Sequence, residues 1–510
     1  MKLFFLEHPR EVGSDYCNDI ANTPLSSCLI IPSLIGNLEK EHEVRLGDGF
    51  LGKRCYEQLK EEILGFQPRI IGIHMIYQWD EHRRLKAFLK EIAAETEADI
   101  IVFGFYPSFA YEDLLNAIPE IRGVVIGEPE PAFFALAKGL SPEEAPSMAY
   151  RKADGTVGRN PIKTVSDLDS LAYPRYSKEL MNIGEVNIEG SRGCYNHCTF
   201  CYINDYYGSP CRWRGHSTDY VVGLIEKIIR ETGNRRFYFV DPNFFGPGKK
   251  GQKRALEMAA KLKPLNIQFG IEARVNDIHE ETITALIDAG LEEILIGLES
   301  GSQRCLDRLK KNTTVDQNER GLFTLRKAGI APNIGFIMFQ PDSRPEDIRT
   351  NFSFLQRNHL LEDVKITANL LYHNQILLQG SQCYREVENL PSPKPYHIVL
   401  PYENENVGQL ASFMRRLTNR LFRAMTPLWS TFYKENEEVL RIYRKLNQFL
   451  TDTFEEVLSH EETEGLYKEE ELKALAGEKE RVLDEICRNV YAALPDDWRE
   501  QGKTKTSSTC

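Results

Sequence analysis

The sequence predicts an α/β protein in three parts: an open parallel sheet, a partial TIM-like barrel and a helical C-terminal region. Apolar runs alternate with helical patterns over the first 140 residues, and a second alternation begins at residue 186. A period of 3.6 residues takes over after residue 395. At 510 residues the chain is long enough for several cores. We therefore expect domains at 1–140, 186–394 and 395–510, with a linker at 141–185.

The first 140 residues are typical of a Rossmann-like or flavodoxin-like domain. A helix capped by Asp80 is predicted to bury Leu85, Phe88, Leu89 and Ile92. No GxGxxG segment occurs, so a dinucleotide site has no direct support. In such a sheet, ligands bind beyond the carboxyl ends of the strands. Strands are expected at 3–6, 43–46, 70–73, 100–103 and 124–126.

The second alternation predicts a partial (β/α)6 barrel. It follows a segment rich in Ser, Pro, Asp and Gly, which has the composition of a linker lying over a surface. Chemistry in such barrels is found at the carboxyl ends of the strands. Six strands are expected, at 186–188, 237–240, 267–271, 293–296, 334–338 and 365–371.

Three apolar stripes predict packed helices in the C-terminal region, and stripes of this kind usually form a core rather than a cofactor site. The third follows an exposed, charged stretch at 461–480. The polar tail 502–510 is expected to be disordered. The stripes contain Leu410, Phe413, Met414, Leu417 and Leu421, then Val439, Ile442, Tyr443, Leu446 and Leu450, then Val482, Ile486 and Val490.

Three cysteines, Cys194, Cys198 and Cys201, follow the first predicted barrel strand. Three thiolates within eight residues can bind three corners of a [4Fe–4S] cluster, which leaves the fourth iron open to a small molecule. A structural zinc site would normally need a fourth ligand at regular spacing. A disulfide framework is disfavoured, because the 11 cysteines show no paired pattern and no secretory segment precedes them. The spacing therefore indicates a cluster.

Charge and hydropathy narrow the function classes. A net charge of −12 disfavours a nucleic-acid groove, which usually needs a basic face. The apolar start of the chain ends at Glu7, far short of a membrane span. We expect a cytoplasmic protein, where reducing conditions suit a cluster, acting on a small molecule or peptide.

The cysteine spacing, with Phe200 before the third cysteine, resembles the signature of the radical S-adenosylmethionine (SAM) superfamily. The resemblance implies that a reduced cluster cleaves SAM to a 5′-deoxyadenosyl radical, with electrons from a flavodoxin-type or ferredoxin-type donor. It departs from the family at Phe339-Gln340-Pro341, where a Gly-Xaa-Pro turn is common. The SAM contacts that it implies are Phe200, Asp241, Arg274, Glu299 and Ser300.

The N-terminal layer resembles the cobalamin-binding domain of B12-dependent radical SAM enzymes, through the segments 104–108, 119–121 and 125–130. No Asp-x-His-x-x-Gly occurs in residues 1–140, so we expect no protein ligand on the lower face of cobalt. His8, His42, His74 and His82 are expected to be surface or turn residues. The cobalamin contacts that we predict are Tyr77, Trp79, Gly104, Ser108, Gly127 and Glu128.

Together the resemblances imply a [4Fe–4S] cluster, SAM and cobalamin, and a methyltransferase that acts on an unactivated carbon of a natural product or its precursor. An alternative within the same class is a radical rearrangement, dehydration or cyclisation without methyl transfer. An alternative of another class is an iron–sulfur electron-transfer scaffold, in which Cys211, Cys305 and Cys383 could hold a second cluster.

Overall fold

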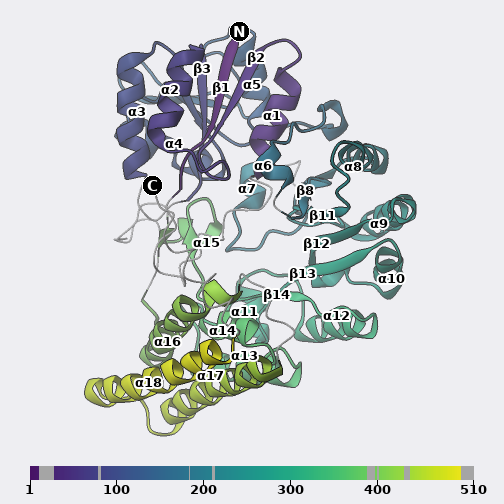
Figure 1. The fold of residues 1–510 in the computed structure, drawn as a ribbon. Helices are drawn as coiled ribbons and strands as arrows, with labels where there is room; N and C mark the ends of the chain where they lie inside the picture. The colour runs from purple at the N-terminus through teal and green to yellow at the C-terminus, as the bar shows by residue number, and fades with distance from the viewer. Residues whose placement is uncertain are drawn as a thin grey trace.

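The computed structural model describes residues 1–10, 28–77, 82–182, 184–208, 213–387, 397–398, 401–429 and 437–494. Figure 1 shows the N-terminal sheet at one end, the helical region at the other and a second sheet between them. Over these ranges, no helix combines the length and apolarity that crossing a membrane requires.

The N-terminal sheet has the order β2-β1-β3-β4-β5-β6-β7, and its first five strands are parallel, as predicted. Alternate residues of β1 enter two different cores: Phe4 packs with helices α2, α3 and α4, and Phe5 packs with α1 and α5. Helices therefore cover both faces of this sheet. The elements are β1 (Lys2–Glu7), α1 (Ile30–Leu38), β2 (Glu43–Asp48), α2 (Tyr56–Phe66), β3 (Ile70–His74), α3 (Arg83–Glu95), β4 (Asp99–Phe103), α4 (Phe105–Ala117), β5 (Gly123–Val125) and α5 (Glu130–Ala137).

Residues 141–185, expected to be only a linker, complete this sheet with two antiparallel strands. These are β6 (Met148–Arg151) and β7 (Val157–Arg159), and β6 pairs with β5. Arg151 ties β6 to the end of α4, because its guanidinium donates hydrogen bonds to three carbonyl oxygens there. The acceptors are Leu115 at 2.6 Å, Ile118 at 2.8 Å and Ile121 at 3.0 Å.

The second sheet is entirely parallel and has the order β14-β13-β12-β11-β8, with the first strand of the barrel at one edge. Its strands are β8 (Val186–Ile188), β11 (Arg236–Phe239), β12 (Gln268–Arg274), β13 (Leu291–Glu299) and β14 (Asn333–Phe336). All five agree with predicted strands. Its principal helices are α8 (Thr218–Thr232), α9 (Gly248–Leu262), α10 (Glu280–Asp288), α12 (Val315–Lys327) and α13 (Pro345–Arg357).

The sixth predicted strand, at 365–371, is wrong: this segment lies in helix α14 (Val364–Tyr372). Asp363 caps the helix by accepting hydrogen bonds from the backbone amides of Lys365 and Ile366. The apolar run suited a buried strand or a buried helix, and packing against the C-terminal helices decided between them.

The C-terminal region consists of α16 (Glu405–Trp429), α17 (Glu437–Thr463) and α18 (Glu469–Ala493), which confirms the three predicted helices. The stripe predicted for α18 is confirmed at Val490, which is buried, but not at Val482, which is 37% exposed; Leu483 and Cys487 are buried instead. The charged stretch at 461–480 lies mostly within α17 and α18 rather than in a loop. The predicted disordered tail lies outside the described residues.

We expect Arg151→Met to lower the free energy of unfolding by about 2 kcal/mol, because three carbonyl oxygens lose a charged donor. Urea unfolding followed by circular dichroism would measure the loss. Arg69→Met is the control, since Arg69 is 61% exposed. A cost for Arg151→Met no larger than that of the control would contradict this role.

Candidate functional site

A cavity of about 410 Å³ lies at the carboxyl ends of the second sheet. Val240, Arg274 and Gly297 line it at or near the ends of three neighbouring strands. This is the edge at which barrels of this type place their chemistry. The other side of the lining comes from the cysteine segment, from Lys311 and from residues 373–376.

Cys194, Cys198 and Cys201, the predicted cluster ligands, all line this cavity. They lie between β9 (Ser191–Gly193) and the short helix α7 (Ile203–Tyr207). The backbone amide of Cys201 donates to the carbonyl oxygen of Cys198 at 3.1 Å, which closes a turn within the segment. Burial raises the pKa of the Cys194 thiol, and it raises the pKa of the Cys201 thiol to about 12. Thiolates in this environment therefore need nearby positive charge.

Positive charge is present beside the cysteines. Nη1 of Arg274 lies 3.7 Å from Sγ of Cys198, and the amide of Asn196 donates to the same sulfur at 3.0 Å. Lys311, also in the cavity lining, is buried. Three thiols together with cations and an amide donor fit an iron–sulfur cluster, whose thiolate ligands favour such partners.

Glu299 and Lys311 form a buried ion pair in the cavity wall, with Nζ of Lys311 2.8 Å from Oε1 of Glu299. Glu299 ends β13 in the left-handed region, with φ +64°. A non-glycine residue adopts this conformation only when its surroundings enforce it. The backbone carbonyl of Lys311 also accepts a hydrogen bond from Arg274. The predicted residues Arg274 and Glu299 are therefore linked through a lysine that sequence reasoning missed.

The other predicted SAM contacts divide into two groups. Phe200 lines the cavity, whereas Asp241 and Ser300 are buried and do not belong to its lining. Asp241 accepts hydrogen bonds from the backbone amide of Gly190 at 2.7 Å and from the hydroxyl of Ser191 at 2.8 Å. Ser300 donates to the side-chain oxygen of Asn351 at 2.7 Å. In this structure both residues hold backbone around the site.

Sequence reasoning also missed Glu272 and the segment 373–376, which line the cavity. Glu272 could have been found, because it lies two residues before Arg274 on one strand and therefore on the same face. The segment 373–376 was missed because the residues just before it, 365–371, were wrongly predicted to be a strand. Of the cysteines considered for a second cluster, Cys305 and Cys383 are buried and Cys211 lies outside the described residues.

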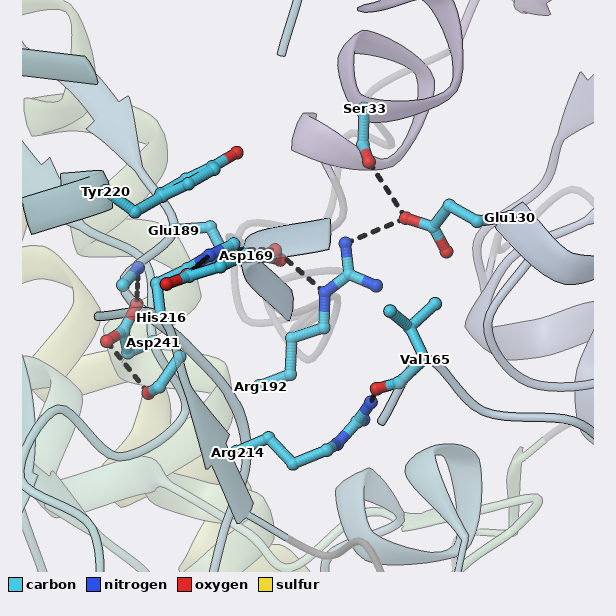
Figure 2. Close-up of polar contacts among 12 residues, drawn as sticks. Ser33, Glu130, Val165, Asp169, Glu189, Arg192, Arg214, His216, Tyr220 and Asp241 are labelled. Atoms are coloured by element: carbon cyan, nitrogen blue, oxygen red, sulfur yellow. Dashed lines mark hydrogen bonds and ion pairs between the residues drawn. The ribbon is translucent and has the colours of Figure 1, made fainter. Parts of the chain in front are cut away.

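A buried guanidinium, that of Arg192, joins the cysteine segment to the N-terminal domain (Figure 2). Arg192 lies in β9, two residues before Cys194, and its side chain is only 5% exposed. Its three nitrogens each contact a different carboxylate at 2.8 Å. These belong to Glu189 from the second sheet and to Glu128 and Glu130 from the N-terminal domain.

The same network extends to the segment between the domains. Arg214, in β10 (Trp213–Gly215), contacts Glu128 at 3.0 Å and donates to the carbonyl oxygen of Val165. Burial opposes ionisation of Glu189, but the charge of Arg192 lowers the pKa of Glu189 to about 2. Glu130 also accepts a hydrogen bond from Ser33 of α1 at 2.8 Å. Five separate segments of the chain therefore meet at these buried charges.

Three of the predicted cobalamin contacts come together at the ends of β4 and β5. The hydroxyl of Ser108 donates to the carbonyl oxygen of Gly104 at 2.7 Å and accepts from the backbone amide of Gly127 at 2.9 Å. Gly104 has φ +125°, and a Cβ there would meet the carbonyl oxygen of Met75 at 2.5 Å. The hydroxyl of Tyr77 donates to the carbonyl oxygen of Gln379. Trp79 lies outside the described residues.

The expectation that the N-terminal histidines are surface or turn residues was wrong for His8 and His74, whereas His82 lies in a turn but is buried. His8, His74 and His82 are buried near the carboxyl ends of β1 and β3. Burial lowers the pKa of His8 to about 4 and that of His74 to about 3, so both rings are neutral at neutral pH. Nδ1 of His74 lies 2.7 Å from a carboxylate oxygen of Glu7. Their burial comes from strand pairing, which single residues do not reveal.

Comparison with known proteins agrees with this geometry. Residues 188–355, which hold the cysteines and four of the five strands in the second sheet, match the Radical SAM superfamily. The uncharacterized methyltransferase PH0819 of Pyrococcus horikoshii is 26% identical over 375 residues, which are 70% of this chain and 78% of that protein. The anaerobic magnesium-protoporphyrin IX monomethyl ester cyclase of Cereibacter sphaeroides is 25% identical over 315 residues. These cover 58% of this chain and 50% of the cyclase.

A solved structure extends the likeness to the whole chain. The cobalamin-dependent SAM radical enzyme OxsB, with aqua-cobalamin and SAM bound, superposes with a TM-score of 0.80 and 20% identity. The match covers 99% of this chain and 83% of OxsB. Both sheets and the C-terminal helices therefore belong to one shared fold.

We expect Arg192→Met to lower the free energy of unfolding by about 3–5 kcal/mol, because three carboxylates lose their shared cation in a buried site. The double variant Arg192→Met/Glu130→Gln should cost at least about 1 kcal/mol less than the two single losses added together. Chemical unfolding would measure all three variants.

Lys227→Met is the matched control, because Lys227 makes an exposed ion pair with Glu231 that contributes at most about 1 kcal/mol. Strictly additive losses for Arg192 and Glu130 would show that the two side chains do not act together.

Proposed function

Since the chain is a radical SAM protein, we propose that it is a cobalamin-dependent enzyme that methylates an unactivated carbon. The substrate class that we propose is a small molecule or peptide, most simply a natural product or its precursor. The main support for this proposal is that one fold combines a cavity lined by three cysteines with a Rossmann-like domain that contacts the cysteine segment directly. Support for methyl transfer comes from the relative PH0819, which is named as a methyltransferase.

The cavity residues would divide the work of holding the cluster and SAM. When bound, the cluster supplies an iron with an open position and the electron for reductive cleavage of SAM. Cys194, Cys198 and Cys201 would bind the cluster. Arg274 places positive charge beside it, where a carboxylate of SAM would find a partner. The apolar ring of Phe200 excludes water from the same wall.

Cobalamin would be held at the carboxyl ends of β3, β4 and β5 by Tyr77, Gly104, Ser108 and Gly127. When bound, it supplies a cobalt centre for methyl-group chemistry. Among the residues that the structure describes, Nε2 of His8 and Nε2 of His74 are buried with no hydrogen-bond partner. Polar atoms that lack partners at this edge of the sheet fit a polar ligand there. Glu128 is engaged by Arg192 and Arg214, so we propose that it positions this edge.

A second candidate function is a radical cyclisation without methyl transfer, for which the similarity to the cyclase of Cereibacter sphaeroides is the specific support. It would use the same cluster and the same cavity, so the two candidates differ in product rather than in site. An electron donor of the flavodoxin or ferredoxin type and a cytoplasmic location stay predictions.

We expect Cys194→Ala, Cys198→Ala and Cys201→Ala each to abolish production of 5′-deoxyadenosine, because the cluster loses a thiolate ligand. The assay is chromatography after anaerobic reconstitution with iron and sulfide, incubation with SAM and reduction by dithionite. Cys55→Ser is the control, since Cys55 lies outside the cavity lining. Undiminished production of 5′-deoxyadenosine in the variant that carries all three substitutions would refute the assignment of radical SAM chemistry to this protein.

We expect the protein to bind cobalamin with no protein nitrogen on the lower face of cobalt. The reason is the missing sequence motif, since no Asp-x-His-x-x-Gly segment occurs in residues 1–140. Electron paramagnetic resonance of the Co(II) form would test this, because an axial nitrogen splits the cobalt lines. A nitrogen-split spectrum, lost in His74→Gln or in His8→Gln, would contradict the expectation and identify the ligand.

A further inference from the structure

Glu272 is an acidic group in the cavity whose carboxylate forms no ion pair with any described residue. It projects from β12 into the lining, two residues before Arg274. Within the described part of the chain, no hydrogen bond or ion pair reaches its carboxylate, whereas the other carboxylate of the lining, that of Glu299, is paired with Lys311. Glu272 is therefore the acid of this cavity that remains available to a ligand.

The surroundings of Glu272 make an unpaired negative charge costly. Its register partner on β13 is Leu295, and Val240 lies on the other side, so the neighbouring cavity walls are apolar. Burial raises the pKa of Glu272 to about 7, and the negative charge of Asp241 adds to this effect. A carboxylate in such a place gains most from a cationic partner.

Asp241, the acid that sequence resemblance assigned to SAM, is already occupied. Its two oxygens accept hydrogen bonds from Gly190 and Ser191, at 2.7 and 2.8 Å. Its side chain is buried and does not belong to the cavity lining, while its neighbours Val240 and Pro242 line the cavity. The structure therefore offers a different carboxylate, on the next strand, to whatever binds in the cavity.

We propose that Glu272 provides the negative charge that binds a cationic group of SAM, either its ammonium or its sulfonium. SAM carries these two positive centres and one carboxylate. Arg274 lies on the cysteine side of the cavity, beside Cys198, and suits the carboxylate, whereas Glu272 lies deeper along β12 and suits a cation. This inference rests on the proposed radical SAM function and deepens it by assigning one of its binding residues.

The test measures the binding of three ligands to reconstituted full-length protein by calorimetry. SAM has both cationic centres, S-adenosylhomocysteine retains only the ammonium, and 5′-methylthioadenosine has neither. Glu272→Gln removes the charge and keeps the size of the side chain. Glu293→Gln is the matched control, because Glu293 lies on the neighbouring strand β13, outside the cavity lining, where it contacts Asn333.

We expect Glu272→Gln to weaken SAM binding by between about tenfold and hundredfold, the range for a lost charge-assisted hydrogen bond, and to leave 5′-methylthioadenosine unchanged. An equal loss for S-adenosylhomocysteine assigns the ammonium, and a loss confined to SAM assigns the sulfonium. Glu293→Gln should bind all three ligands as the wild type does. Iron content and melting temperature would show that each variant is folded and loaded.

Two results would overturn the proposal. If Glu272→Gln bound SAM with wild-type affinity, the charge of Glu272 would have no role in SAM binding. An equal loss of affinity for 5′-methylthioadenosine would show that the substitution acts by changing the shape of the cavity. Either result leaves the proposed function standing, because the wild type still binds SAM. A wild-type protein that binds no SAM and makes no 5′-deoxyadenosine would instead refute the proposed function together with this inference.

Discussion

The buried guanidinium of Arg192 fixes how the cysteine segment meets the N-terminal domain. Removing one arginine and three carboxylates from water costs free energy. The ion pairs offset this cost only when all three carboxylates contact the guanidinium. Two of those partners, Glu128 and Glu130, follow the last parallel strand of the N-terminal sheet. Because Arg192 lies only two residues before Cys194, the charges that join the domains also determine where Cys194 can lie.

Aromatic packing holds the other end of the same segment. Helix α7 begins two residues after Cys201, and its Tyr206 ring stacks on Phe105 of α4 with centroids 4.0 Å apart. Tyr202 also contacts Tyr77 of the N-terminal domain. The cysteine segment is therefore attached to this domain through charges before it and rings after it. Such an arrangement suits chemistry that needs two cofactors at a constant separation.

The charges in the cavity are ordered along the strands. Arg274 and Lys311 lie toward the cysteines, and Glu272 lies further back on the face of β12 that carries Arg274. The Glu299–Lys311 pair neutralises one cation within the wall, while Arg274 remains in contact with Cys198. A zwitterionic ligand would thus meet the positive charge of Arg274 near the three cysteines and the negative charge of Glu272 deeper in the barrel.

The cysteine site, the two alternating sheets and the three C-terminal helices could be predicted from the sequence alone, because each depends on a local pattern of residues. Tertiary structure decided the identity of α14, since an apolar run of that length suits either a helix or a strand. It also decided the partners of Lys311, Glu128 and the buried histidines. Those contacts join residues far apart in the chain, and only packing brings their charges within reach.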